Sequence, residues 1–166
     1  IEKEKIDAPA MLFETKIFKK IKGFDENFFL YFEDNDYFKK CNNLNLKLYL
    51  ISNSYFKHSI PKKYCKLLNV KSSSFSNLKE KNDNYSVGGW HGQWSKFYYL
   101  KKYNGFFKAL IICLPNIILN IIQLLIYIFI NPAKAKYKYY KIEGFFCSCF
   151  GIRSFKRSKF DKEHIY

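Results

Sequence analysis

The sequence contains very little arginine. Arg153 and Arg157 are the only arginines among its 29 basic residues; the acidic residues number 14, and the formal net charge is +15. Proteins that read nucleic-acid sequence rely on arginine for bidentate contacts with bases and phosphates. The composition therefore argues against a nucleic-acid partner. The lysine excess instead favours attraction to an anionic membrane surface or to phosphorylated ligands.

Paired cysteines of the metal-binding kind are also missing. None of the five cysteines forms a Cys-x-x-Cys pair, and Cys147 and Cys149 are too close together for an ordinary two-ligand zinc knuckle. We expect reduced, buried thiols in a cytoplasmic protein. The first residue is Ile1 rather than Met, so we expect a fragment whose preceding part is missing.

The most informative stretch is residues 23–36, in which aromatic and aliphatic side chains lead into a cluster of carboxylates. The cluster consists of Glu33, Asp34 and Asp36. An isolated buried carboxylate is too costly, so these acids must be paired, bound to metal, hydrated or reactive.

The residues after this stretch predict a helix from Glu33 to about Asn43. Phe38 and Cys41 recur at helical spacing, and Asp34 lies on the same face, whereas Asp36 lies nearer the opposite side. The positive end of the helix would hold Asp34 ionised and facing the core, as a general base requires. The alternative is that Asp34 and Asp36 only cap the helix.

Short strands and one helix are predicted around this element. Residues 8–13 and 46–51 predict strands, and residues 15–22 predict a helix that ends at Gly23. A further strand over residues 55–58 ends at His58. That histidine is either a metal ligand or a hydrogen-bonded structural residue.

The second half of the chain is predicted to meet a membrane. After a polar surface loop over residues 59–87 and a glycine turn at residues 88–89, an aromatic helix is expected to reach about residue 103. Residues 109–130 are apolar and long enough to span a bilayer. Pro115 is expected to kink this helix, and the basic tail 153–166 is expected to be loose.

One polar stripe runs down the apolar helix, formed by Asn116, Asn120, Gln123 and Tyr127. A stripe of this kind is typical of a helix in the membrane interface, of a re-entrant hairpin or of a span packed against a partner. Lysines flank both ends of the helix, which favours a helix that lies on the membrane over one that crosses it.

In this order, the motif Gly23–Asp36, His58 and the segment from Trp90 to Lys102 resemble the C-terminal half of a family 2 inverting glycosyltransferase, in its rhamnosyltransferase-like branch. The resemblance covers most of residues 6–105. It implies an α/β fold, the C-terminal part of a GT-A nucleotide-sugar transferase. Residues 1–105 would be the acceptor-side half, and residues 106–166 an apolar membrane-associating helix with a basic tail.

The resemblance also implies roles for individual residues. Asp34 would be the base that deprotonates the acceptor hydroxyl, with Glu33 and Asp36 orienting the catalytic site. His58 would join a divalent cation, Mg²⁺ or Mn²⁺, that neutralises the departing nucleoside diphosphate. The acceptor side would be lined by Met11, Phe29, Tyr31 and Trp90.

The implied partners are a nucleotide-sugar donor and a lipid-linked or glycan acceptor, at the cytoplasmic face of the inner (plasma) membrane. Where the family usually has glycine, this chain has Ala8 or Pro9, and the family's Asp-x-Asp metal motif would lie before Ile1. We therefore expect the fragment alone to be inactive. The alternative function is a non-catalytic module that binds the membrane surface.

Overall fold

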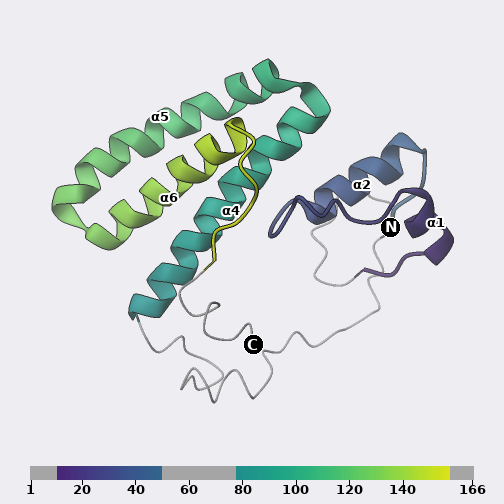
Figure 1. The fold of residues 1–166 in the computed structure, drawn as a ribbon, viewed down its shortest axis with the longest axis horizontal. Helices are drawn as coiled ribbons and strands as arrows, with labels where there is room; N and C mark the ends of the chain where they lie inside the picture. Colours follow the sequence, from purple (N-terminus) through teal and green to yellow (C-terminus); the bar gives the residue numbers. More distant parts are fainter. Residues whose placement is uncertain (1–10, 50–77, 158–166) are drawn as a thin grey trace, which may run out of the picture.

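The computed structural model describes residues 11–49 and 78–157. Within these ranges the chain forms helices and no strand, and Tyr49 alone makes an isolated bridge. The elements, shown in Figure 1, are α1 (Thr15–Lys20), α2 (Glu33–Asn43), α4 (Leu78–Asn104), α5 (Phe106–Ile130) and α6 (Pro132–Cys149). The predicted α/β class, and with it the GT-A fold, is therefore wrong for the described part of the chain.

The misassigned strands have a physical explanation. Residues 11–13 and 46–48 are irregular, while residues 8–10 and the predicted strand at 55–58 lie outside the described residues. Leu46 and Leu48 pack against a cluster that includes Phe38 and Cys41 of α2. Alternating leucines can cover one side of a helix as well as one face of a sheet, so the alternation alone does not distinguish the two structures.

The ends of α1 and α2 confirm the sequence prediction. After α1, the Gly23 amide donates to the Phe18 carbonyl at 2.9 Å, and Gly23 has φ +61°. After α2, Leu46 donates to Cys41 at 3.0 Å, and Asn45 takes φ +54°. Both are six-to-one helix terminations that require left-handed backbone at the residue before the donor. After α2 this residue is Asn45, which adopts the conformation at low cost; after α1 it is Lys22, with φ +58°, and Gly23 lies one position beyond it.

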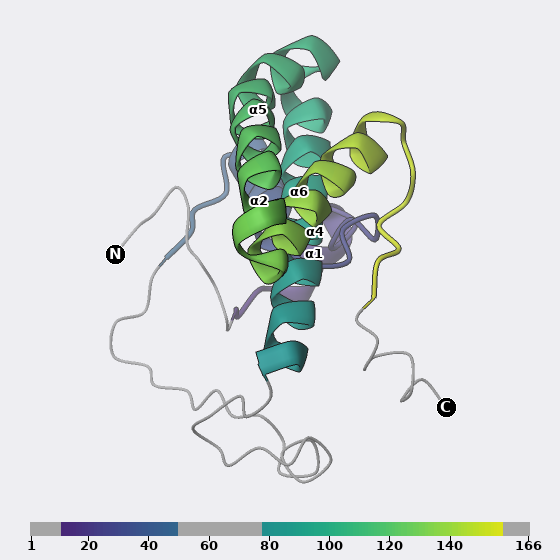
Figure 2. The same cartoon turned by 90° about the vertical axis from the view of Figure 1, so that its left-hand side faces the viewer.

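Helices α4, α5 and α6 run up, down and up, and α6 packs against both of the others (Figures 1 and 2). The core between them consists of Phe97, Ala109, Cys113, Ile117 and Phe145. The predicted boundary at residues 105 and 106 falls at the bend between α4 and α5, where Gly105 has φ +81°. All three helices nevertheless pack as one bundle.

Gly88 and Gly89 lie inside α4, so the turn predicted at these residues is wrong. The described part of the predicted loop, residues 78–87, is also helical rather than irregular. A side chain at Gly89 would collide with the ring of Tyr137, and one at Gly88 would lie 3.2 Å from the Tyr31 hydroxyl. The glycines therefore leave room for aromatic rings from α6 and from residues 23–36, which we call the acidic motif. Gly144 of α6 serves a similar purpose, because a Cβ there would collide with the Trp90 backbone carbonyl.

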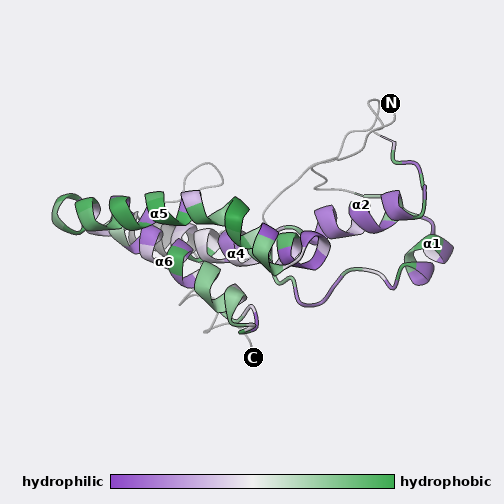
Figure 3. Cartoon of the chain, turned by 90° about the horizontal axis from the view of Figure 1, so that it is seen from above, coloured by the Kyte–Doolittle hydropathy of each residue, from purple (hydrophilic) through white to green (hydrophobic). Residues whose placement is uncertain are grey.

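Helix α5 turns its polar stripe inward and its apolar side outward. Asn120 is buried, and Asn116, Gln123 and Tyr127 are half-buried. The outward side chains are exposed isoleucines, leucines and a phenylalanine, among them Ile118, Leu125 and Phe129. Figure 3 shows α5 as the most hydrophobic element of the described chain. The helix continues through Pro115 and is long and apolar enough to cross a membrane.

Candidate functional site

The backbone of the acidic motif is strained where it enters α2. Tyr31 and Phe32 both have positive φ, +67° and +68°, a conformation that bulky residues rarely adopt. Ser95 of α4 holds this turn by donating to the Leu30 carbonyl at 2.9 Å, and the Tyr31 ring lies against Gly92 of α4. Strain of this kind, at about 1 to 3 kcal/mol per residue, concentrates at functional sites.

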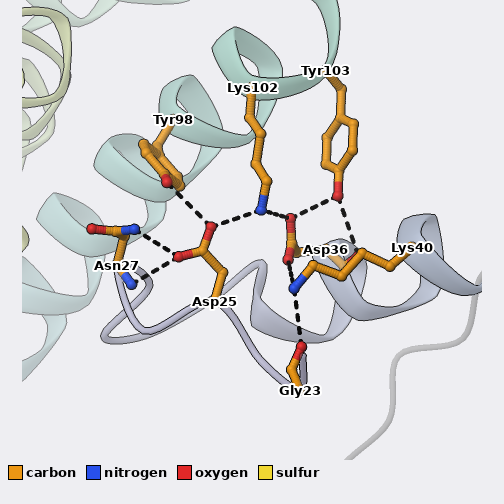
Figure 4. Close-up of polar contacts among 8 residues, drawn as sticks. All are labelled: Gly23, Asp25, Asn27, Asp36, Lys40, Tyr98, Lys102 and Tyr103. Carbon is orange, nitrogen blue, oxygen red and sulfur yellow. Dashed lines mark hydrogen bonds and ion pairs between the residues drawn. The ribbon is translucent and has the colours of Figure 1, made fainter. Parts of the chain in front are cut away.

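Asp36 is the carboxylate at the centre of the site. It is completely buried, and its Oδ1 accepts hydrogen bonds from Lys102 Nζ at 2.6 Å and from the Tyr103 hydroxyl at 2.8 Å (Figure 4). Lys40 Nζ lies 3.0 Å from the other carboxylate oxygen. A buried carboxylate needs such partners, so Asp36 joins α2 to the end of α4.

Lys102 also pairs with Asp25, at the start of the motif. The Lys102 Nζ to Asp25 Oδ2 distance is 2.7 Å, and the Tyr98 hydroxyl donates to the same oxygen at 3.1 Å. Burial opposes ionisation of Asp25, but the hydrogen bonds from Lys102 and Asn27 outweigh it and lower its pKa to about 2. Burial likewise opposes the charge on Lys102, yet its two carboxylate partners raise its pKa. One lysine thus joins both ends of the motif.

Asp34 differs from these two acids. It is half-buried in the first turn of α2, and its Oδ1 accepts from the Asn35 amide at 2.7 Å and from Asn35 Nδ2 at 2.9 Å. Within the described residues no cation pairs with it. Glu33, in the same turn, has a buried Oε2 with no hydrogen-bond partner in the described part of the chain.

The prediction that Asp36 lies on the side of α2 opposite the core is wrong, because Asp36 is completely buried. The apolar pattern identified the side of α2 that carries Phe38 and Cys41, but α2 has a second buried side, which faces lysines and tyrosines of α4. The capping alternative fits neither acid fully: Phe32 is the N-cap residue and makes no side-chain cap bond. Asp34 does satisfy one amide of the first turn, whereas Asp36 bridges to α4.

The predicted acceptor-side residues do not form one wall. Phe29 and Tyr31 are about half exposed on the motif, whereas Met11 packs against the apolar cluster beside α2. Trp90 is fully buried, with its ring against Phe155, and is closed to any ligand in this conformation. Phe29 and Tyr31 are therefore more exposed than Met11, which is half-buried, and than Trp90.

His58 lies outside the described residues. Among residues 11–49 and 78–157, no group of three or more histidine, cysteine, aspartate or glutamate side chains is placed to hold a metal ion. The predicted ligand of the divalent cation, His58, is therefore not joined by a described cluster of further ligands. The cation stays a prediction.

Sequence reasoning missed the segment after α6, which was expected to be loose. Residues 152–157 instead lie along α4, held by His91 and Trp94. His91 Nδ1 is 2.9 Å from Ser154 Oγ, and Trp94 Nε1 donates to the Ile152 carbonyl at 2.8 Å. The signal was indirect: a histidine and a tryptophan on an aromatic helix face need polar partners when buried.

Comparison with protein-family models, with curated proteins and with solved structures found no match.

Proposed function

We propose that this chain is the acceptor-side part of a membrane-associated inverting glycosyltransferase, in which Asp34 accepts the proton of the acceptor hydroxyl. The observation that carries the proposal is the division of the motif's acids. Asp25 and Asp36 are committed to Lys102, whereas Asp34 has no cation partner among the described residues. A base must be ionised and within reach of its substrate, and of Asp25, Asp34 and Asp36 only Asp34 combines partial exposure with a helix N-terminus. Glu33 lies in the same turn, but its Oε2 is buried.

Two further features support this assignment. The resemblance of the motif to family 2 glycosyltransferases places the base at Asp34, independently of the geometry. The strained turn at Tyr31 and Phe32 directly precedes α2, so the anchoring by Ser95 and Lys102 fixes the position from which Asp34 projects. Residues 11–49 and 78–157 contain no sheet that could bind a nucleotide, so the donor would be bound by other residues of the protein.

The test is a transfer assay with the complete gene product that contains this chain. Radiolabelled nucleotide sugars are offered one at a time with an extract of lipid-linked acceptors, and lipid-soluble radioactivity is measured. The proposal predicts transfer from at least one donor, with inversion at the anomeric carbon. Absence of transfer from every donor would contradict it and would leave the second candidate.

That second candidate, a module that binds the membrane surface, is favoured by the outward face of α5. Exposed apolar side chains follow each other along α5, and extended apolar surfaces of this kind mark interaction sites. Helix α6 runs alongside α5 and carries Lys134, Lys136, Lys138 and Lys141. A lysine at the bilayer centre costs about 2.5 to 3.5 kcal/mol. The arrangement therefore favours a bundle that lies on the membrane with α5 in the interface.

Vesicle binding tests this candidate. We expect the double variant Ile118→Asn with Leu125→Asn to bind anionic vesicles about tenfold or more weakly, because two exposed apolar side chains leave the lipid phase. Leu12→Asn, at an exposed leucine outside α5, is the matched control and should bind as wild type does. Oriented circular dichroism should show helices parallel to the membrane plane; a transmembrane signature would contradict the surface arrangement.

A further inference from the structure

The two arginines of the chain meet at one cavity. A hollow of about 410 Å³ lies between the acidic motif and the segment after α6, and both Arg153 and Arg157 line it. Ser154 and Asn27 also reach it, and Glu26 is its one acidic lining residue. A chain that uses lysine for nearly all of its positive charge thus places its only guanidinium groups together.

The cavity wall is held in place by specific contacts. His91 is completely buried, and its Nε2 is 2.6 Å from the Lys156 carbonyl oxygen. Because a carbonyl oxygen can only accept a hydrogen bond, Nε2 must carry the proton. Its Nδ1 then accepts from the Ser154 hydroxyl. Burial lowers the pKa of His91, and the charge of Arg157 adds to the effect, which favours this neutral form. Lys156 Nζ pairs with Glu143 at 2.5 Å, so the segment is also tied to α6.

The arginine side chains are available for a ligand. The Arg157 guanidinium lies over the Phe29 ring, with Cζ 3.3 Å from the ring centroid, and one of its nitrogens donates to the Lys156 carbonyl at 3.0 Å. Stacking fixes the plane of the group while leaving other N–H donors at its edge. Arg153 is exposed, and no carboxylate among the described residues pairs with either arginine.

We propose that this cavity binds a phosphate or diphosphate group through Arg153 and Arg157, with the side-chain amide of Asn27 as a neutral hydrogen-bond donor. Planar guanidinium groups match phosphate oxygens with paired N–H donors, which lysine cannot do. The single carboxylate of Glu26 leaves the lining with a net positive charge. The inference does not depend on Asp34 acting as a base, because it concerns a separate group of residues.

The ligand could be a soluble anion or the head group of a lipid, and the two sources share this chemistry. The full chain in nanodiscs of neutral lipid is titrated with inorganic pyrophosphate by calorimetry. In a second arm, the chain is mixed with neutral vesicles with and without a long-chain prenyl diphosphate. Binding in both arms indicates a site open to either source, and binding of pyrophosphate alone indicates a soluble ligand. Binding only to the doped vesicles indicates a lipid head group.

Three variants make the test specific. The double variant Arg153→Gln with Arg157→Gln should weaken diphosphate binding about tenfold or more. Arg157→Lys keeps the charge but loses the paired donors and the stacking, and should weaken it by a smaller factor. Lys108→Gln removes one exposed charge elsewhere and should leave binding within about twofold of wild type. Circular dichroism of each variant checks that the helices remain.

Equal weakening by Lys108→Gln and by the arginine double variant would overturn the proposal, because it would mean that the general positive charge attracts the anion. Absence of binding by the wild-type chain in both arms would also overturn it. Neither result would bear on sugar transfer by Asp34.

Discussion

Lys102 Nζ lies 2.6 Å from Asp36 Oδ1 and 2.7 Å from Asp25 Oδ2, so one side chain of α4 joins the beginning and the end of the acidic motif. The charge of Asp36 is tolerated inside the protein because of this contact and those of Lys40 and Tyr103. The network therefore sets the position of α2, and with it the position of Asp34.

Replacing Lys102 should loosen the motif from α4. For Lys102→Met we expect a loss of about 2 to 3 kcal/mol in the free energy of unfolding, because Asp36 remains buried with fewer partners. Lys39→Met, at an exposed lysine of α2, should change it by less than about 0.5 kcal/mol. Urea unfolding in mild detergent measures both. Equal stability of the two variants would mean that Asp36 does not depend on Lys102.

The same network predicts how stability depends on pH. The folded-state pKa of Asp25 is about 2, below its ordinary value of 3.8, so its contribution is present above pH 4 and is lost as the pH falls towards 2. The pKa of Lys102 is raised above 10.5, so its contribution is present below that pH and is lost at higher alkaline pH. Because Asp25 is partly exposed, solvent screening keeps its effect small.

Thermal melting from pH 2 to pH 5 checks the acid limb. Asp25→Asn should show a smaller rise in melting temperature over this interval than wild type, since the amide does not titrate. An identical rise in both proteins would show that Asp25 is not the group responsible.

Two glycines of the bundle, Gly144 where α6 meets α4 and Gly92 where α4 meets Tyr31, give different predictions. Gly144→Ala should destabilise the bundle by about 1 to 3 kcal/mol, because the new Cβ meets the Trp90 carbonyl, which belongs to the rigid backbone. Gly92→Ala should be neutral or stabilising by up to about 1 kcal/mol, because its Cβ would lie an ordinary 3.7 Å from the Tyr31 ring and alanine favours the helix. Equal losses in chemical denaturation would contradict the packing described here.

Local signals in the sequence were enough to predict some elements. The bounds of α2, the left-handed residues at Gly23 and Asn45, and the apolar helix at residues 109–130 follow from propensity, capping and hydropathy, which act over a few residues. Strands at 8–13 and 46–51 were wrong for their described residues, because alternating side chains do not reveal what they pack against.

The candidate site was harder to predict for the same reason. The burial of Asp36 depends on Lys102, and the docking of the segment with Arg153 and Arg157 depends in part on His91; both partners lie more than 60 residues away in the chain. The sequence indicated that a buried acid must be paired. It did not indicate that Lys102 is the partner, because Lys102 is one of the lysines that flank the apolar helix and was interpreted as lying at the membrane surface.

Sugar transfer by the variant Asp34→Asn of the complete gene product tests the central claim most directly. Asparagine keeps the size and the carbonyl oxygen that accepts from Asn35, and it removes the proton-accepting charge. We predict that transfer falls by about two orders of magnitude or more, while circular dichroism and vesicle binding stay unchanged and the control Glu14→Gln remains active. Transfer by Asp34→Asn within about twofold of wild type would contradict the assignment of Asp34 as the base.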